Sequence, residues 1–182
     1  MDDTSSTSPC IDLRAFPLSD AVSVADTLLE QTLTLCAEQM SLQDADIMVD
    51  LLRRGDPVAH HAYEPALARN VAEYLSHLDS GIQAVYRYEC PGGGKSRGHD
   101  EIGARPAIHL VVLARQRTAA LISVLAALNR ALTQTFADRW GAKEVTHVLN
   151  VCVIEDADTR NEASYTSLVF PPHLEPVPVW QR

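Results

Sequence analysis

The chain has 182 residues, which is enough for one ordinary domain with a sizeable core and too few for two full domains. Its formal net charge of −9 opposes binding to phosphate backbones and anionic lipid, which argues against non-specific nucleic-acid and membrane binding. The apolar fraction of 46% and the charged fraction of 21% are typical of folded proteins and exclude wholesale disorder.

The four cysteines are far apart in the sequence and form no C-x-x-C pair, which favours reduced thiols in a cytoplasmic protein. The first residues are acidic and rich in Ser and Thr, without the basic start and apolar stretch of a secretion signal. Residues 1–18 are therefore predicted to be a disordered lead-in. The most apolar window, residues 119–128, is about half as long as a bilayer crossing requires, so no membrane span is expected.

Two amphipathic helices are predicted before residue 56. Apolar residues recur at spacings of three and four from residue 19 to residue 40, and Ser19 is placed to cap the free amides of this helix. Ser41 followed by Asp44 resembles a capping box at the start of the second helix, which Gly55 is expected to end.

A third helix is predicted from Asp56 to Gly81. Asp56 followed by Pro57 is the usual order of a cap and a first-turn proline, and apolar residues mark one face of the segment. Pro65 lies inside this span, so the helix is expected either to be kinked there or to start later.

The pattern then changes to strands. Residues 82–88 alternate with a period of two, and apolar strands are expected at 107–114 and 145–154. The last of these is almost wholly apolar, which predicts that both of its faces are covered. A long helix capped by Thr118 and closed by Gly141 lies between these two strands. The predicted fold class is α+β, with the N-terminal helices packed on a small mixed sheet.

The C-terminal segment is expected to be extended. Residues 164–170 could form an edge strand, and the four prolines in residues 171–182 exclude a helix and a central strand. Residues 19–170 are predicted to form the single domain. The Pro-rich tail ending in Val179 and Trp180 could contact a partner subunit in a homo-oligomer or cross its own domain.

A glycine-rich loop, residues 90–105, separates the first two predicted strands. Its run Gly92–Ser96 is similar to the phosphate loop of nucleotide-binding proteins. Glu89 stands where that motif has its first glycine, however, and the glycines after Ser96 forbid the helix that should follow.

The same loop concentrates positive charge in an otherwise acidic chain. An anionic ligand such as a nucleotide could bind where it meets the amides that start the helix at Thr118. The predicted ligand-binding residues are Gly93, Gly94, Lys95, Ser96, Arg97, Arg105 and Thr118. The alternative is a solvated loop whose charges keep it away from the core.

Residues 82–154 resemble the nucleotidyltransferases of the polymerase-β type. Three features carry the resemblance. The first is the order of elements: strand, loop, strand, helix, strand. The others are Gly94–Gly98, in place of the family's Gly-Ser turn, and Ile108–Val112, in place of its metal-binding strand. The family holds two magnesium ions on carboxylates of these strands. Here Ala107 and His109 take two of those positions, and Asn150 or Cys152 takes the third, so the resemblance implies that catalysis has been lost.

The leading hypothesis is a non-catalytic, nucleotidyltransferase-like binding or regulatory module for a nucleotide or other small anion, with no metal and no cofactor. The first alternative is an active phosphate-transferring or nucleotidyl-transferring enzyme in which His99, Asp100 or Glu101 replaces the missing ligands or serves as acid and base. The second alternative is a structural protein that forms oligomers.

Overall fold

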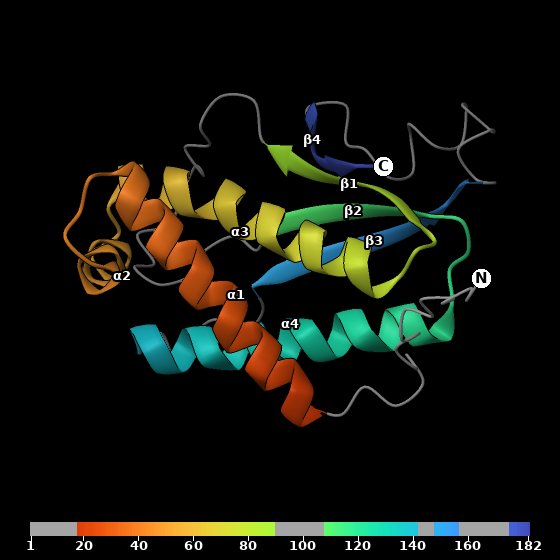
Figure 1. Cartoon of the computed structure of the whole chain (residues 1–182), viewed down its shortest axis with the longest axis horizontal. Coiled ribbons are helices and arrows are strands. Elements are labelled where there is room, and N and C mark those ends of the chain that lie inside the picture. Colours follow the sequence, from red (N-terminus) through yellow and green to blue (C-terminus); the bar gives the residue numbers. More distant parts are fainter. Residues whose placement is uncertain (1–17, 90–107, 142–147, 157–174) are drawn as a thin grey trace, which may run out of the picture.

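The computed structural model describes residues 18–89, 108–141, 148–156 and 175–182. Within this part of the chain, four helices and a mixed sheet of four strands form an α+β fold (Figure 1). The elements are, in chain order, α1 (Leu18–Gln39), α2 (Ala45–Arg53), α3 (Pro57–Leu78), β1 (Ile82–Glu89), β2 (Ile108–Ala114), α4 (Ala119–Trp140), β3 (Leu149–Glu155) and β4 (Glu175–Gln181).

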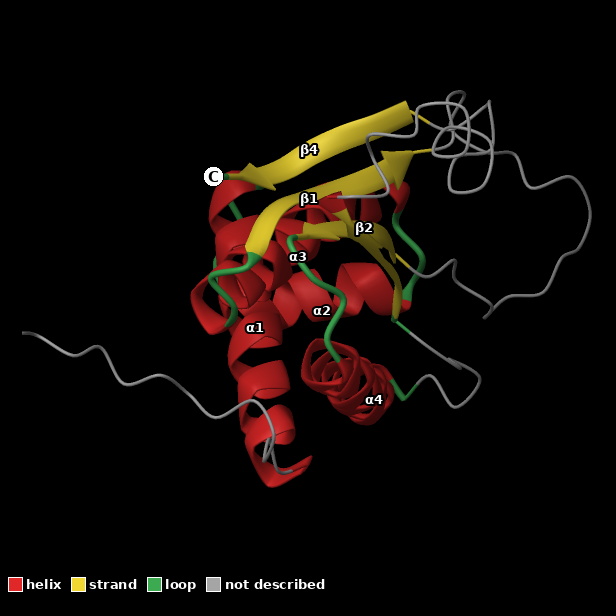
Figure 2. Cartoon of the chain, turned by 90° about the vertical axis from the view of Figure 1, so that its right-hand side faces the viewer, coloured by secondary structure: helices red, strands yellow, loops and turns green. Residues whose placement is uncertain are grey.

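The sheet has the strand order β3-β2-β1-β4. β1 is antiparallel to both β2 and β4, whereas β2 and β3 are parallel and are connected through α4. α3 and α4 pack on one face of the sheet, which we call the inner face, and α1 crosses them on the side away from the strands (Figure 2). No helix of the described residues lies on the other, outer face (Figure 2).

α1 joins the helical layer because one stripe of small and apolar side chains runs along its length. Ala25, Leu29, Leu33 and Cys36 are completely or almost completely buried, at the spacing that the sequence predicts. The predicted cap is wrong, because α1 begins at Leu18 and Ser19 therefore lies inside the helix.

α2 begins at a different cap from the one expected. The Asp44 side chain accepts a hydrogen bond from the Ile47 amide at 3.0 Å, so Asp44 is the N-cap. Ser41 instead has a φ of 55° in the turn after α1, and its amide bonds to the Glu38 carbonyl. Gly55 has a φ of 79°, which confirms the predicted left-handed stop.

α3 starts where predicted and continues through its internal proline. The Asp56 carboxylate accepts hydrogen bonds from the amides of Val58 and Ala59, both at 2.9 Å. The alternative of a later start is wrong, since the helix runs from Pro57 to Leu78 with Pro65 inside. An internal proline costs about 3 kcal/mol, and burial of the apolar face of this helix offsets that cost.

The strands β1, β2 and β3 present different side chains to the two faces of the sheet. Val85, Leu110 and Val112 belong to the main core beneath the helices. Val111 pairs with Tyr86 and lies on the outer face, where Tyr88, Val111 and Ile154 form a second, smaller cluster. The alternation expected for a strand with two distinct faces therefore holds for β1 and β2.

β3 differs from its prediction. It begins at Leu149, and its outer face is exposed at Asn150 and Cys152 and buried only at Ile154, although the apolar composition suggested full coverage. β3 lies at the edge of the described sheet, where one exposed face is common. Two side chains of α4 hold its start, because Asn129 accepts a hydrogen bond from the Leu149 amide at 3.0 Å and Thr133 accepts one from the Val148 amide at 3.1 Å.

The Pro-rich segment contains the other edge strand of the described sheet. β4 carries Pro176 and Pro178 and pairs with β1, and an edge is the place where a strand tolerates prolines. Val179 and Trp180 pack against the main core of their own chain. The edge strand expected at residues 164–170 lies outside the described residues.

α4 extends well beyond the apolar window at residues 119–128. By length and composition alone its stretch Ala119–Arg139 could cross a membrane, and half of that stretch is buried within the fold. The core helix of a globular protein passes the same test. Here α4 packs against α1, α2 and β3.

Candidate functional site

The strand directions separate the predicted site into two places. Because β1 and β2 are antiparallel, the end of β1 at Glu89 and the start of β2 at Ile108 lie at one end of the sheet, which we call the loop end. The end of β2 and the start of α4 lie at the opposite end (Figure 1). The seven residues of β2 place these ends about 20 Å apart.

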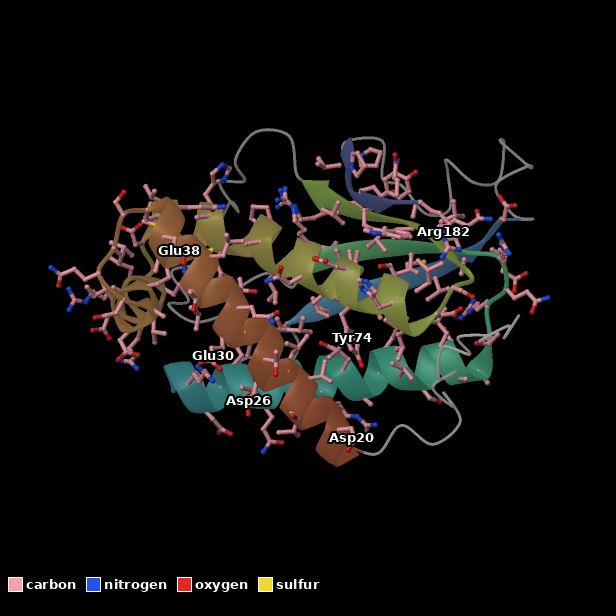
Figure 3. All side chains as sticks on the ribbon, viewed as in Figure 1. Asp20, Asp26, Glu30, Glu38, Tyr74 and Arg182 are labelled. Atoms are coloured by element: carbon pink, nitrogen blue, oxygen red, sulfur yellow. The ribbon has the colours of Figure 1, made fainter. Side chains whose placement is uncertain are left out.

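The end of the sheet where α4 begins carries three exposed arginines. Arg115 and Arg117 follow β2, and Arg182 follows β4. We call this region the arginine end, and define it by Ser80, Arg115, Arg117, Thr118, Glu155 and Arg182. Arg182 lies on the side of the molecule where α4 begins (Figure 3).

Backbone hydrogen bonds hold the arginine end together. The Arg115 amide donates to the Gly81 carbonyl at 2.9 Å, and the Arg182 amide donates to the Gln83 carbonyl at 3.0 Å. The guanidinium of Arg182 also donates to the Ser80 carbonyl. The turn before β1 therefore joins the residues that follow β2 to those that follow β4.

The N-terminus of α4 adds a partial positive charge to the arginine end. Thr118 is the N-cap, and its hydroxyl oxygen accepts a hydrogen bond from the Leu121 amide at 3.1 Å. The other amides of a first helical turn lack carbonyl partners within the helix, so they favour anions nearby. The prediction that Thr118 caps this helix is confirmed.

A carboxylate already lies within this positive region. Oε1 of Glu155, at the end of β3, accepts a hydrogen bond from the Arg117 amide at 2.7 Å. Asp156 follows it directly in the sequence. Asp79, whose carboxylate accepts a hydrogen bond from the Gly81 amide in the turn that contains Ser80, is a third acidic residue at this end. Three arginines are thus accompanied by three acidic residues in a chain of net charge −9.

Most of the residues predicted to bind a ligand lie outside the described residues. These are the loop residues Gly93, Gly94, Lys95, Ser96, Arg97 and Arg105, together with the candidate acids and bases His99, Asp100 and Glu101. The two ends of their segment, Glu89 and Ile108, belong to the loop end, whereas Thr118 belongs to the arginine end. The predicted meeting of loop and helix start therefore requires the segment to reach back along the full length of the strands.

The structure places side by side His109 and Asn150, two of the positions that the sequence resemblance compared with metal-binding carboxylates, while Ala107 lies outside the described residues. His109 on β2 and Asn150 on β3 are register partners, and Nδ1 of His109 lies 3.1 Å from Nδ2 of Asn150. Cys152 is the next residue of β3 on the same outer face, and all three side chains are exposed. None of them supplies a carboxylate oxygen, and the described residues contain no group of three or more His, Cys, Asp or Glu side chains that could hold a metal ion.

Two histidines on α3 bond to the backbone. Nε2 of His60 lies 3.2 Å from the Leu52 carbonyl, and Nδ1 of His77 lies 2.8 Å from the Glu73 carbonyl. Each ring nitrogen therefore donates to a carbonyl oxygen, which fixes its tautomer in the neutral form.

Sequence reasoning missed Glu155 and Arg182 as members of the arginine end. Glu155 ends β3 and Arg182 follows β4, and the sequence left the direction and pairing of both strands open, so their place at this end of the sheet was not predictable from spacing. A signal was available only for Arg115 and Arg117, which stand directly between a predicted strand and a predicted helix.

The described fold is that of an α+β domain with a parallel β2–α4–β3 unit inside a mixed sheet. No protein-family model, no curated protein and no solved structure matches the chain.

Proposed function

We propose that this chain is a non-catalytic binding or regulatory module for a small anion, such as the phosphates of a nucleotide, and that the anion binds at the arginine end. The observation that supports this proposal is the position of two exposed arginines, Arg115 and Arg117, directly before the N-terminus of α4. In sheets with parallel strands, ligands bind beyond the carboxyl ends of those strands, and the arginine end has that position relative to β2 and β3.

Arginine suits such a ligand better than an isolated helix end does. The guanidinium group presents a planar set of donors that matches phosphate oxygens, and Arg115 and Arg117 are both exposed. Neither guanidinium takes part in the ion pairs formed among the described residues. The arginines are therefore available to a ligand, while Glu155 limits its affinity by repulsion.

We propose further that the order β1, β2, α4, β3 is a degenerate nucleotidyltransferase arrangement. The neighbouring positions of His109 and Asn150 support this, because the metal-binding carboxylates of that family lie on the equivalent adjacent strands. Without carboxylates there, a nucleotide would bind through its phosphates rather than through a magnesium bridge.

The test is calorimetric titration of the full chain with ATP, once with magnesium and once with a chelator. The double variant Arg115→Gln and Arg117→Gln should weaken binding about thirtyfold, because each of the two lost contacts to a phosphate is worth roughly 1 kcal/mol at an exposed site. Glu155→Gln keeps the acceptor for the Arg117 amide and removes the charge, so it should tighten binding about threefold.

Arg130→Gln on the exposed surface of α4 is the matched control and should leave the affinity unchanged. A second double variant, Lys95→Ala and Arg97→Ala, distinguishes a binding site at the arginine end from one in the glycine-rich loop. Weaker binding in this variant alone would assign the site to the glycine-rich loop.

Absence of ATP binding both with magnesium and with the chelator would refute the anion site. Turnover of ATP that requires magnesium would favour the alternative of an active enzyme.

A further inference from the structure

A long, shallow groove runs along α1 on the helical side of the molecule, and α3 lines only the smaller of its two hollows; we call it the α1–α3 groove. It consists of two hollows of about 420 Å³ and about 330 Å³ that share Thr27 and Gln31 as lining residues. The α1 wall extends from Ser23 to Glu38, and the α3 wall from Asn70 to His77. The α1 wall is about 22 Å long at the rise of a helix, which is about four helical turns.

The floor of this α1–α3 groove carries a narrow apolar stripe. Val24, Leu28 and Leu35 all contact the main core, and Leu28 is 5% exposed whereas Val24 and Leu35 are half-buried. With Gln31 they follow the spacing of four, three and four residues that forms the contact seam of two packed helices. α1 therefore offers one more helix a partly exposed seam.

The rim of the groove is negatively charged. Glu30 and Glu38 on α1 and Glu73 on α3 are exposed, and the described residues that line the groove include no lysine or arginine. The Asp20 carboxylate adds a further negative charge near Tyr74, whose pKa is raised by burial and then by this carboxylate. Asp20, Glu30 and Glu38 are spread along the length of α1, and Tyr74 lies beside that helix (Figure 3).

The shape and the charge select among the possible occupants. A groove of four helical turns is much longer than a small molecule needs and matches one amphipathic helix. A second copy of this chain would bring the same acidic α1 against the first, and like charges in contact oppose such a pairing. A positively charged partner has the complementary potential.

We propose that the α1–α3 groove is a docking surface for an amphipathic, lysine- or arginine-rich helix of a partner protein. The apolar stripe of that helix packs over Val24 and Leu35, and its basic flanks face Glu30, Glu38 and Glu73. This surface lies on the helical layer and is separate from the arginine end of the sheet.

The probe is an 18-residue fluorescein-labelled peptide of leucine and lysine with leucines at helical spacing, titrated by fluorescence anisotropy. A peptide of the same composition in permuted order keeps the charge and loses the apolar face, and it should bind at least tenfold more weakly. The triple variant Glu30→Gln, Glu38→Gln and Glu73→Gln should weaken the amphipathic peptide about tenfold, since rim charges are each worth up to about 1 kcal/mol.

The control triple Asp46→Asn, Asp50→Asn and Asp138→Asn changes the net charge by the same amount on α2 and α4, and should change affinity less than twofold. Val24→Ser tests the floor and should also weaken binding, and thermal melting of each variant establishes that it is folded. Equal binding of the two peptides, equal effects of the two triples, or no binding would each overturn the proposal. Sedimentation that finds a dimer blocked by the peptide would assign the groove to a second copy instead.

Discussion

The two faces of the sheet differ in what they bury. On the inner face, Leu110 and Val112 lie beneath α3 and α4 and are almost fully inaccessible. On the outer face, His109 from the same strand is exposed and meets Asn150, and only a small cluster around Val111 is buried. Adjacent residues of one strand thus have different roles: the inner face holds the fold together, and the outer face leaves polar side chains accessible to solvent.

The largest expected effect comes from the inner face of β2. Leu110→Ala should lower the free energy of unfolding by about 3 kcal/mol, because it removes a buried side chain and leaves a cavity in the main core. His109→Ala, one residue earlier and exposed, should cost less than about 0.5 kcal/mol. Urea unfolding followed by circular dichroism measures both. Similar decreases in the free energy of unfolding for the two variants would show that the two faces do not differ in their contribution to stability.

A buried thiol in the helical layer should also make the free energy of unfolding fall as the pH rises in the alkaline range. Burial raises the pKa of the Cys36 thiol from its ordinary 9.0 to about 11, so the folded state holds this proton more tightly than the unfolded state does. The resulting stability is complete below pH 9 and is lost as the pH rises through 11. The expected loss between pH 8 and pH 11 is about 2 kcal/mol, measured by urea unfolding across that range.

Two cysteine variants provide the controls for this pH dependence. Cys36→Ala should reduce the slope, and the remainder should come from Tyr63, whose pKa burial also raises. Cys152→Ala removes an exposed thiol from the outer face and should leave the slope unchanged. A slope that persists in full in Cys36→Ala would contradict the assignment to the buried thiol.

A smaller effect is expected from the outer cluster. Ile154→Val removes one methyl group from a residue that is 5% exposed beside Tyr88 and Val111, and it should cost about 1 kcal/mol. The comparison is Val153→Ala, the neighbouring residue in the main core, which removes two methyl groups and should cost more than twice as much if the inner face is the more tightly packed. No measurable loss in Ile154→Val would mean that the outer cluster contributes nothing to stability.

The helices and their ends were largely predictable because their signals are local. The stripe of α1, the Asp56–Pro57 start of α3 and the Gly55 stop each depend on residues within a few positions, and each is present in the structure. The capping box at Ser41 failed because Asp44 competes for the same helix start and has the geometry to reach the Ile47 amide.

The candidate site was less predictable because it depends on strand direction. Periodicity identifies β1 and β2 as strands and says nothing of which end of each lies beside Thr118. The antiparallel pairing sends the ends of the glycine-rich segment to the loop end, and the pairing of β4 with β1 brings Arg182 to the arginine end. The exposure of β3 on its outer face was not predictable either, since an apolar strand at the edge of a sheet and one in the middle have similar compositions.

The pairing of β4 with β1 has a consequence for the order in which the chain folds. Gln181 and Tyr86 bond across 95 positions of sequence, whereas the contacts between α2 and α3 join near neighbours. Contacts so distant form late, because a long loop must close before they contribute any stability. Until then β1 has an uncovered hydrogen-bonding edge that strands of other chains can occupy. The concentration at which the protein refolds will therefore decide how much of it reaches the native sheet and how much aggregates.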